Sequence, residues 1–513
     1  MSKKYLPLHL LLIVILLYNC SDNNQKNFYN IKDFGAKSDS TYINTKSIND
    51  AINTCNKMGG GKVYVPQGIY YSGTINLKSN VTLYLESGAV IKGSKDTADY
   101  IKDGKRYGLF YTRNAKNITI EGSGEINGNG TYFHDPTQPH IAGDLAVEYT
   151  RQGNDFMNIK YGLDDGPIKY KYRPGMMMVF MKCENIKIKD VMLKDTPEWT
   201  MRVGDCDNVE VSGVSVHANL LVPNSDGIHC TNSRNVRISN CDIRCGDDAV
   251  IVSGFDENVG VHSGQKNDAA INTFEYGNKT GYAENIVVSN CLLQSRSAGI
   301  RIGYGNLPIR NCIFSNLVIY ESNRGIGIFT RDSAGIENLF FNNIQIDTRL
   351  HKGHWWGKGE PIHVSNINRE EGMKTGTIKN IRFNNINMTA ETGVVAYSET
   401  ANSIENIQFH NCNLYIKKSK IDEIYGGNID LRPAFAVDKQ IFKSDIPGYY
   451  IYNVKNIQMK DIQVGWASDL ATFYTHGIWC KNVSGGYILN YIGSGASDKY
   501  KSLAIENSNI QIK

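Results

Sequence analysis

The chain has 513 residues, of which 41% are hydrophobic and 21% are charged, and its formal net charge at pH 7 is +4. Because acidic and basic residues nearly cancel, no basic block indicates nucleic-acid binding and no acidic tail indicates disorder. The length alone allows several domains, but solenoids and other all-β architectures often exceed the usual limit of a single core.

The first twenty residues have the features of a targeting segment. Two lysines precede an apolar run that ends at Leu17 and is too short to span a bilayer as a helix. The run leads into LYNC, a loose version of the lipobox that bacterial lipoproteins carry before the lipidated cysteine. We therefore expect residues 1–20 to be a lipoprotein signal peptide, Cys20 to be lipidated and residues 21–27 to be a polar tether.

This interpretation predicts an exported protein that is lipid-anchored to the outer membrane or cell surface and meets the membrane only through that anchor. The alternative is an ordinary cleaved signal with a chance cysteine, which would give a periplasmic or secreted protein.

The fold is expected to begin at Phe28. Residues 47–58 have apolar positions at helical spacing, three glycines end the helix, and KVYVP returns to a strand pattern. We predict a short capping helix that closes the first coil of a solenoid. A phosphate-binding loop at GGGK is rejected, because helix, glycines and strand follow one another in the order opposite to that of a P-loop.

A short repeat dominates the rest of the chain. Each copy has an Asn, an alternating apolar pair and a polar turn, and the copies are NITIEG at Asn117, NIKIKD at Asn185, NVEVSG at Asn208, NVRISN at Asn235, NIVVSN at Asn285, NLFFNN at Asn338, NIRFNN at Asn380, NIQFHN at Asn406 and NIQMKD at Asn456. Uninterrupted copies are 23 to 27 residues apart, the period of a solenoid coil. We predict an all-β fold over residues 28–513, a single parallel β-helix whose elongated groove suits a polymer.

Ten cysteines follow the signal segment, and an exported protein could oxidise them. Most lie close to an Asn in the strand and turn register, where a free cysteine behaves as a small buried hydrophobe. Stacked ladders account for this spacing better than a disulfide framework does.

Three acidic residues, Asp226, Asp247 and Asp248, lie at the two ends of one repeat, in NSD and GDD. If the repeat is one coil, all three carboxylates return to the same edge, several ångströms apart, since stacked strands are about 4.8 Å apart. One acid can then protonate a leaving oxygen while a carboxylate activates water, and close like charges raise at least one pKa. The alternatives are that these residues only satisfy turn backbone groups, or that they ligate a hard cation.

These two motifs resemble the NTD and GDD motifs of glycoside hydrolase family 28, the polygalacturonase family. FYNIKDFGAKSDS, the stretch from GGGKVYVP to IKGS, the Arg173-Pro174 pair and TPEWT also resemble family stretches in family order. The resemblance implies a right-handed parallel β-helix and an inverting glycosidase without a cofactor or metal. It also implies that Asp247 is the general acid, while Asp226 and Asp248 together activate water.

The sequence departs from the family at positions that help to bind a uronate carboxylate. Ala298 replaces the His of a GHG motif, and Gly327 and Phe329 replace the Arg and Lys of RIK. Arg301, Arg324, Arg331 and Lys358 are candidates to supply positive charge from other positions, although each type is more often a solvated side chain.

Two segments interrupt the repeats. Residues 128–171 show no periodicity, so we predict a long loop over one cleft wall. Residues 349–365 cluster Trp355 and Trp356 with Lys358 and Glu360, side chains that can pack on sugar rings and bind hydroxyl or anionic groups. The alternative is a loop pinned to the solenoid by a buried Trp.

His229 follows Asp226 by three residues and is a candidate to face the same cleft, although a lone His is usually structural. Trp199 in TPEWT is expected to be structural.

The sequence therefore predicts a hydrolase acting on a polysaccharide, either pectic or a modified galactan, with no nucleic-acid partner. A polysaccharide lyase on the same fold and a catalytically inactive carbohydrate-binding surface protein remain as alternatives. The lyase would need a calcium site and a basic residue that abstracts a proton, and the inactive protein would not need its acids.

Overall fold

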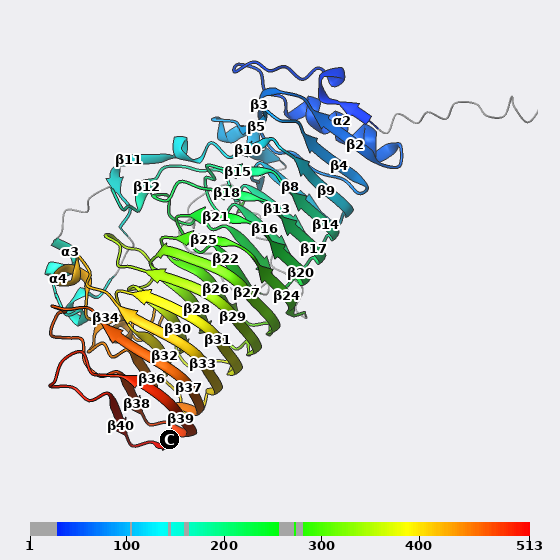
Figure 1. Cartoon of the computed structure of the whole chain (residues 1–513). Coiled ribbons are helices and arrows are strands. Elements are labelled where there is room, and N and C mark those ends of the chain that lie inside the picture. The colour runs from blue at the N-terminus through cyan, green and yellow to red at the C-terminus, as the bar shows by residue number, and fades with distance from the viewer. Residues whose placement is uncertain (1–27, 103–104, 142–144, 159–163, 256–270, 273–280) are drawn as a thin grey trace, which may run out of the picture.

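A computed structural model of the chain describes residues 28–513 except residues 103–104, 142–144, 159–163, 256–270 and 273–280 (Figure 1). The predicted signal peptide, Cys20 and the tether lie outside the described residues. Within the described part of the chain, no helix is both long enough and apolar enough to cross a bilayer.

Short parallel strands are stacked coil upon coil along one axis, from the capping helix at one end to the C-terminus at the other (Figure 1). Two parallel sheets run along this axis. The twelve-stranded sheet contains β8 (Phe110–Arg113), β13 (Met178–Met181), β16 (Met201–Gly204), β19 (Ile228–Thr231), β22 (Val250–Gly254), β26 (Ala298–Gly305), β28 (Arg324–Thr330), β30 (Glu360–Asn366), β32 (Val394–Ser398), β36 (Tyr449–Tyr452), β38 (Ile478–Lys481) and β40 (Leu503–Glu506).

The second sheet forms the rest of the coil wall. Its strands are β1 (Phe28–Asn30), β2 (Gly61–Val65), β3 (Gly68–Ser72), β4 (Val81–Leu85), β5 (Ala89–Gly93), β9 (Lys116–Gly122), β10 (Glu125–Asn127), β14 (Glu184–Lys189), β15 (Met192–Lys194), β17 (Asp207–Ser212), β18 (Ser215–His217), β20 (Arg234–Ser239), β21 (Asp242–Cys245), β24 (Ala283–Ser289), β25 (Leu292–Ser295), β27 (Ile309–Ser322), β29 (Ile336–Thr348), β31 (Ile378–Ala390), β33 (Ile404–Ile416), β37 (Val454–Trp466), β39 (Ser484–Gly493) and β41 (Asn509–Ile512).

The inside of the coil is one hydrophobic cluster that extends from Tyr29 to Ile488. It includes a column of phenylalanine rings, one per coil, in which Phe314, Phe341, Phe383 and Phe409 stack with centroids 4.9, 5.0 and 4.9 Å apart. Because each coil alternates inward and outward residues, the apolar pair of every repeat faces this core.

The Asn that begins each repeat has a left-handed backbone, with φ between 54° and 58° at all nine positions. This conformation turns the chain into the next strand, and Asn tolerates it better than most other residues. The side chains also form a ladder between coils: Asn380 donates to Asn338 at 3.0 Å and accepts from Asn406 at 3.0 Å. Each repeat therefore combines an Asn that the turn requires with an apolar pair that the strand buries in the core.

The predicted capping helix is α2 (Thr45–Lys57), which begins two residues earlier than expected and is followed by three glycines with positive φ. The ten described cysteines are all free and buried, as their spacing predicted.

The interruption at residues 128–171 is more regular than expected. It contains the antiparallel pair β11 (His134–Pro139) and β12 (Ile168–Tyr170) and the short helix α3 (Asp155–Asn158). Lack of periodicity indicated a loop, but a single hairpin with few residues leaves no periodic signal. The elements outside the two long sheets also include α4 (Asp422–Tyr425), β34 (Asn428–Asp430), β35 (Ile441–Lys443), β6 (Ile101–Lys102), β7 (Lys105–Arg106), β23 (Ile271–Asn272), and the 3-10 helices η1 (Ile31–Phe34), η2 (Thr97–Tyr100), η3 (Gly130–Phe133), η4 (Val147–Tyr149) and η6 (Val437–Lys439).

Candidate active site

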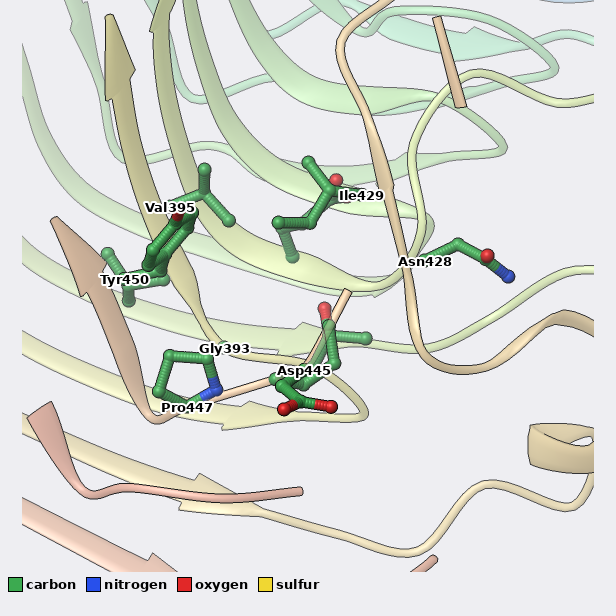
Figure 2. A pocket seen from close by; sticks show the side chains of 11 residues that line it. Gly393, Val395, Asn428, Ile429, Asp445, Pro447 and Tyr450 are labelled. Carbon is green, nitrogen blue, oxygen red and sulfur yellow. The ribbon is translucent and has the colours of Figure 1, made fainter. Parts of the chain in front are cut away.

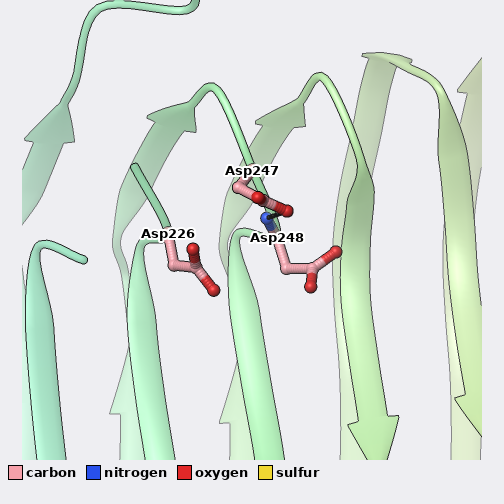
Figure 3. A group of neighbouring side chains, drawn as sticks. All are labelled: Asp226, Asp247 and Asp248. Atoms are coloured by element: carbon pink, nitrogen blue, oxygen red, sulfur yellow. Dashed lines mark hydrogen bonds between the residues drawn. The ribbon is translucent and has the colours of Figure 1, made fainter. Parts of the chain in front are cut away.

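The three acidic residues lie where neighbouring coils enter the twelve-stranded sheet. Asp226 precedes β19 by two residues and Asp248 precedes β22 by two, and these strands pair in parallel with Ile228 opposite Val250. The same register places Asp226 level with Asp248 on the next coil. Asp247 is beside Asp248, and Figure 3 shows the three carboxylates gathered at this edge.

Each carboxylate contributes an oxygen that lies within 4.8 Å of the others. All three side chains are buried, with 3%, 7% and 5% of Asp226, Asp247 and Asp248 exposed. The cluster predicted from the one-coil spacing therefore forms, and it is largely withdrawn from water.

Asp248 is held by several donors. Its Oδ1 accepts hydrogen bonds from the Ser297 hydroxyl at 2.8 Å and from the Ala298 amide at 3.0 Å. Its Oδ2 forms a buried ion pair with Nε of Arg301, whose Nη1 donates to the Gly303 carbonyl. These contacts fix the position of the Asp248 carboxylate.

Asp247 and Asp226 have fewer contacts that stabilise a negative charge. Burial, followed by the charge of Asp248, raises the pKa of Asp247 to about 7. Burial and the other two carboxylates raise the pKa of Asp226 well above its ordinary value. Its Oδ1 is buried without a hydrogen-bond partner in the described part of the chain. The cluster consequently retains a proton near neutral pH, which a general acid requires.

The backbone around the acids is set by a close approach of two coils. The Gly246 amide donates to the Ser225 hydroxyl at 2.8 Å, and that hydroxyl donates to the Val222 carbonyl at 2.8 Å. A Cβ at Gly246 would lie 2.2 Å from the Val222 carbonyl oxygen. Gly246 is therefore needed for the close contact between coils.

Arg173 is a residue that the sequence arguments did not place in the site. Its Nη1 donates to the Pro223 carbonyl at 3.2 Å and its Nη2 to Oδ1 of Asn224 at 3.1 Å. It thus fixes the turn that carries Asp226. The Arg173-Pro174 pair was the available signal, but its role depends on contacts 50 residues apart in sequence.

His229 lies on β19 with its ring fully buried. Its Nε2 is 2.8 Å from the Ser253 hydroxyl, and its ring centroid is 4.0 Å from that of Trp199. Trp199 is itself 5% exposed within a small cluster that includes Phe255. These contacts give both rings a packing role beside the acids.

The positions that depart from the family are filled by neighbouring side chains. A Cβ at Gly327 would lie 2.6 Å from the ring of Phe329, so this ring occupies the space beside Gly327. The guanidinium groups of Arg324 and Arg331 each lie 5.0 Å from the centroid of the same ring. Positive charge is therefore present around Phe329, but it comes from different positions.

These arginines are already engaged. Nη2 of Arg324 is 3.4 Å from Glu360, and Arg331 donates to the backbone carbonyls of Thr330, Ser365 and Leu431. Arg301 is paired with Asp248.

The two tryptophans of the second interruption differ. Trp355 is 2% exposed, and its indole N–H donates to the Asp165 carbonyl at 2.8 Å. Trp356 is half-buried, with the Arg432 guanidinium 4.6 Å from its ring. Trp355 therefore fits the alternative of a loop pinned by a buried Trp, and it does not line an open surface.

Lys358 and Glu360 are also buried. Burial lowers the pKa of Lys358 to about 8, and its ammonium group lies 5.2 Å from the ring centroid of Phe156 and 5.5 Å from that of Tyr425. Glu360 accepts hydrogen bonds from the Lys358 amide and lies 3.1 Å from His363. The structure thus brings Lys358, Glu360 and Arg324 into one buried network, separate from the three acids.

Metal ligation at the three acids is the other chemistry open to this geometry, because hard cations bind clustered carboxylates. Two observations favour proton chemistry. Arg301 already supplies a cation to Asp248, and both oxygens of Asp248 are engaged by protein donors.

The chain is a parallel β-helix protein with clustered carboxylates at one coil edge, and known proteins of similar sequence narrow this class. The model of glycosyl hydrolases family 28 matches residues 55–333, more than half of the chain. The chain belongs to this family, which confirms the resemblance seen in the motifs.

Curated relatives include a probable polygalacturonase of Vitis vinifera, 30% identical over 44% of this chain and 44% of that protein. An exo-poly-alpha-D-galacturonosidase of Dickeya chrysanthemi is 27% identical over 56% of this chain and 55% of that protein. The chain thus spans about half the length of these two relatives.

Two solved structures share the fold. An exopolygalacturonase from Thermotoga maritima has a TM-score of 0.57 and 21% identity, over 76% of this chain and 87% of that one. A family 28 exopolygalacturonase from Yersinia enterocolitica has a TM-score of 0.60 and 16% identity, over 94% of this chain and 78% of that one. These likenesses confirm the predicted right-handed parallel β-helix.

Proposed function

We propose that the chain hydrolyses glycosidic bonds within a polysaccharide and that Asp247 is the general acid. The observation that carries this proposal is the buried trio, in which burial and Asp248 raise the pKa of Asp247 to about 7. Such a group is protonated at a useful fraction near neutral pH and can transfer its proton to the leaving oxygen.

In this mechanism Asp226 activates water with the help of Asp248. One oxygen of Asp226 has no hydrogen-bond partner among the described residues, while both oxygens of Asp248 are engaged. The base role of Asp226 rests on the family resemblance: the ionised form of Asp226 takes the proton from water, and Asp248 lies beside it.

Inversion of configuration is part of the proposal and rests on the family resemblance. Inverting enzymes usually hold their carboxyl pairs about 6.5 to 9.5 Å apart and retaining enzymes about 5 to 5.5 Å. The closest oxygens here lie within 4.8 Å, so the spacing does not itself favour inversion. Proton NMR of the first-formed anomer tests this point, and net retention would contradict it.

The test of the reaction is a screen of the purified protein on galacturonans, rhamnogalacturonans and sulfated galactans. We expect new reducing ends without absorbance from a new double bond; such absorbance would indicate a lyase instead. Asp247→Asn preserves shape but removes the proton donor, so turnover should fall by orders of magnitude with folding unchanged. Wild-type activity in this variant would refute the assignment of Asp247.

We also propose that the protein is exported and anchored by lipid on Cys20, from the residues that precede it. Cys20→Ser should move the protein from the membrane fraction to the soluble fraction. Equal membrane association of both forms would contradict the anchor.

A further inference from the structure

The outer face of the twelve-stranded sheet can be followed from the acids toward the C-terminus. Asp248 lies at the entry of β22, and the pairing of Val250 with Ile300 and of Ala298 with Arg324 places Arg324 level with Asp248, two strands farther on. With strands about 4.8 Å apart, this distance along the sheet face is about 10 Å. Glu360 follows one strand later.

At this point two chain segments lie directly on the strands. We call residues 349–359 and 421–433 the covering wall. Asn323, next to Arg324, donates to the carbonyls of Trp356 and Gly357, both at 3.0 Å, and the Gly359 amide donates back to the Asn323 carbonyl at 2.8 Å.

The second segment of the covering wall is bonded to the same strands. Nη2 of Arg324 donates to the Asp430 carbonyl at 3.3 Å, and Nη2 of Arg331 donates to the Leu431 carbonyl at 3.0 Å. Arg324 and Arg331 therefore donate hydrogen bonds to the covering wall.

Arg432 joins the two segments to each other. Its Nη2 donates to the Trp355 carbonyl at 2.7 Å and to Oδ2 of Asp430 at 2.7 Å. The Gly357 amide donates to the same Asp430 oxygen at 2.8 Å. Buried charge-assisted hydrogen bonds of this kind are stronger than neutral ones, so the segments form one rigid layer.

The outer side of the wall is supported by a second small core. Phe156, Leu350 and Tyr425 form a separate hydrophobic cluster, and the Phe156 and Tyr425 rings are 5.2 Å apart. Figure 1 shows α3, α4 and β34 gathered on this side of the solenoid. Asp165 adds an ion pair to Arg349 at 3.1 Å.

One cavity between the covering wall and β32 is small. The cavity between Asn428 and Ile429 on one side and Gly393 and Val395 on the other has a volume of about 10 Å³ (Figure 2). A volume of this size holds at most one water molecule. A sugar ring does not fit there.

We propose that the enzyme attacks its polysaccharide at a chain end, because the covering wall lies on the sheet face two strands beyond Asp248. This inference rests on the proposed hydrolase function. A long chain bound across the acids would have to pass over Arg324 and Glu360, whose outward faces are covered. Only a short terminal part of the substrate fits between the acids and the wall.

The test uses whichever polysaccharide of the screen releases reducing ends. From the first minutes we expect one short product, and the viscosity should fall slowly for each bond cleaved. An early ladder of many oligosaccharide sizes with a steep loss of viscosity would overturn the chain-end inference and leave the hydrolase proposal intact. No reducing ends from any polymer would overturn the hydrolase proposal and this inference with it.

Arg432→Met removes the bonds that join the two wall segments and should raise the share of internal cuts several-fold. Asn323→Ala is the second variant, because it releases the wall from the strands with a smaller change. Arg310→Met, which removes a guanidinium bonded to Glu284 on the other sheet, is the matched control. An unchanged product pattern in a wall variant with the wild-type melting temperature would contradict the wall as the cause of chain-end action.

Discussion

The three acidic residues are chemically similar but have different surroundings. Asp248 has an arginine and two further donors, Asp247 accepts from the Asp248 amide at 3.0 Å and from Nδ2 of Asn224 at 3.5 Å, and one oxygen of Asp226 has no partner among the described residues. Burial and neighbouring carboxylates raise the pKa values of Asp226 and Asp247, so two of three identical side chains favour the protonated form. The raised pKa of Asp247 supports its role as the acid, while the base role of Asp226 requires its ionised form.

Arg301 is predicted to act as a positioning residue for Asp248. Arg301→Met should remove a positive charge that lowers the pKa values of Asp226 and Asp247, so the acidic limb of the pH–activity profile should move to higher pH and turnover should fall at least tenfold. Arg301→Lys retains the positive charge but lacks the planar guanidinium group with its several donors. It should therefore recover part of the turnover and part of the shift in the pH profile. The measurement is the pH profile of kcat for the three proteins. Loss of activity in Arg301→Met without a shift of the acidic limb would point to a purely structural role.

Asp247 should also affect stability in a pH-dependent way. Its pKa in the folded protein is about 7, above its ordinary value of 3.8, so the folded form is favoured below about pH 4 and this contribution is lost as pH rises through 7. Asp247→Asn should therefore unfold at a higher temperature than wild type at pH 8. The free energy of unfolding should rise by an amount on the order of a few kcal/mol at most, with no gain at pH 4. Thermal unfolding at the two pH values tests this. An equal effect at both would show that burial does not raise the pKa.

At the scale of the elements, each repeat joins a left-handed Asn, an inward apolar pair and a ladder of side-chain amides. The left-handed turn and the ladder of hydrogen bonds contribute separately to the stability of the fold. A left-handed conformation costs an L-residue roughly 1–2 kcal/mol unless it is Gly or Asn, while each hydrogen bond contributes about 0.5–1.5 kcal/mol.

Asn380 allows these contributions to be measured, because it donates to one neighbouring coil and accepts from another. Asn380→Gly should lose only the ladder bonds and destabilise the protein by about 1 kcal/mol, whereas Asn380→Ala should also carry the backbone strain and cost about 2 to 3 kcal/mol. Denaturant unfolding of both variants is the measurement. Equal losses in the two variants would show that the left-handed backbone is not what selects Asn.

These elements also explain how far the sequence could predict the structure. The coil period and the acid cluster were predictable, because Asn turns and apolar pairs act within one repeat and NSD and GDD are one coil apart. Arg301 was recognised only as a candidate charge, since its partner Asp248 is 53 residues away. Trp355 and the covering wall depend on contacts among residues 128–171, 349–359 and 421–433, which are far apart in sequence, and such contacts have no local periodicity.

For the whole molecule, the arrangement of charge along the outer face of the twelve-stranded sheet bears on the substrate. Three of the arginines that lie around the positions where the sequence departs from the family are each paired with a carboxylate of the protein. Arg301 is paired with Asp248, Arg324 with Glu360 and Arg432 with Asp430. Arg331 has no acidic partner within ion-pair distance among the described residues, but it is fully buried and bonded to backbone carbonyls. Several arginines therefore lie along this sheet face, but most of their N–H donors are already bonded within the protein.

Plain polygalacturonic acid is consequently predicted to be a poor substrate. Its carboxylates would have to be desolvated beside Ala298, Gly327 and Phe329, which carry no charge, and burying an unpaired carboxylate costs several kcal/mol. A pectic side structure or a modified galactan, with a neutral sugar at the cleaved bond or its charge elsewhere, avoids this cost. Initial rates on polygalacturonic acid and on such polymers, measured with the same enzyme preparation and with Asp247→Asn as the inactive control, decide between them. Efficient turnover of polygalacturonic acid that Asp247→Asn abolishes would mean that Arg301, or Lys358 from the wall, gives up its internal contacts to bind the carboxylate.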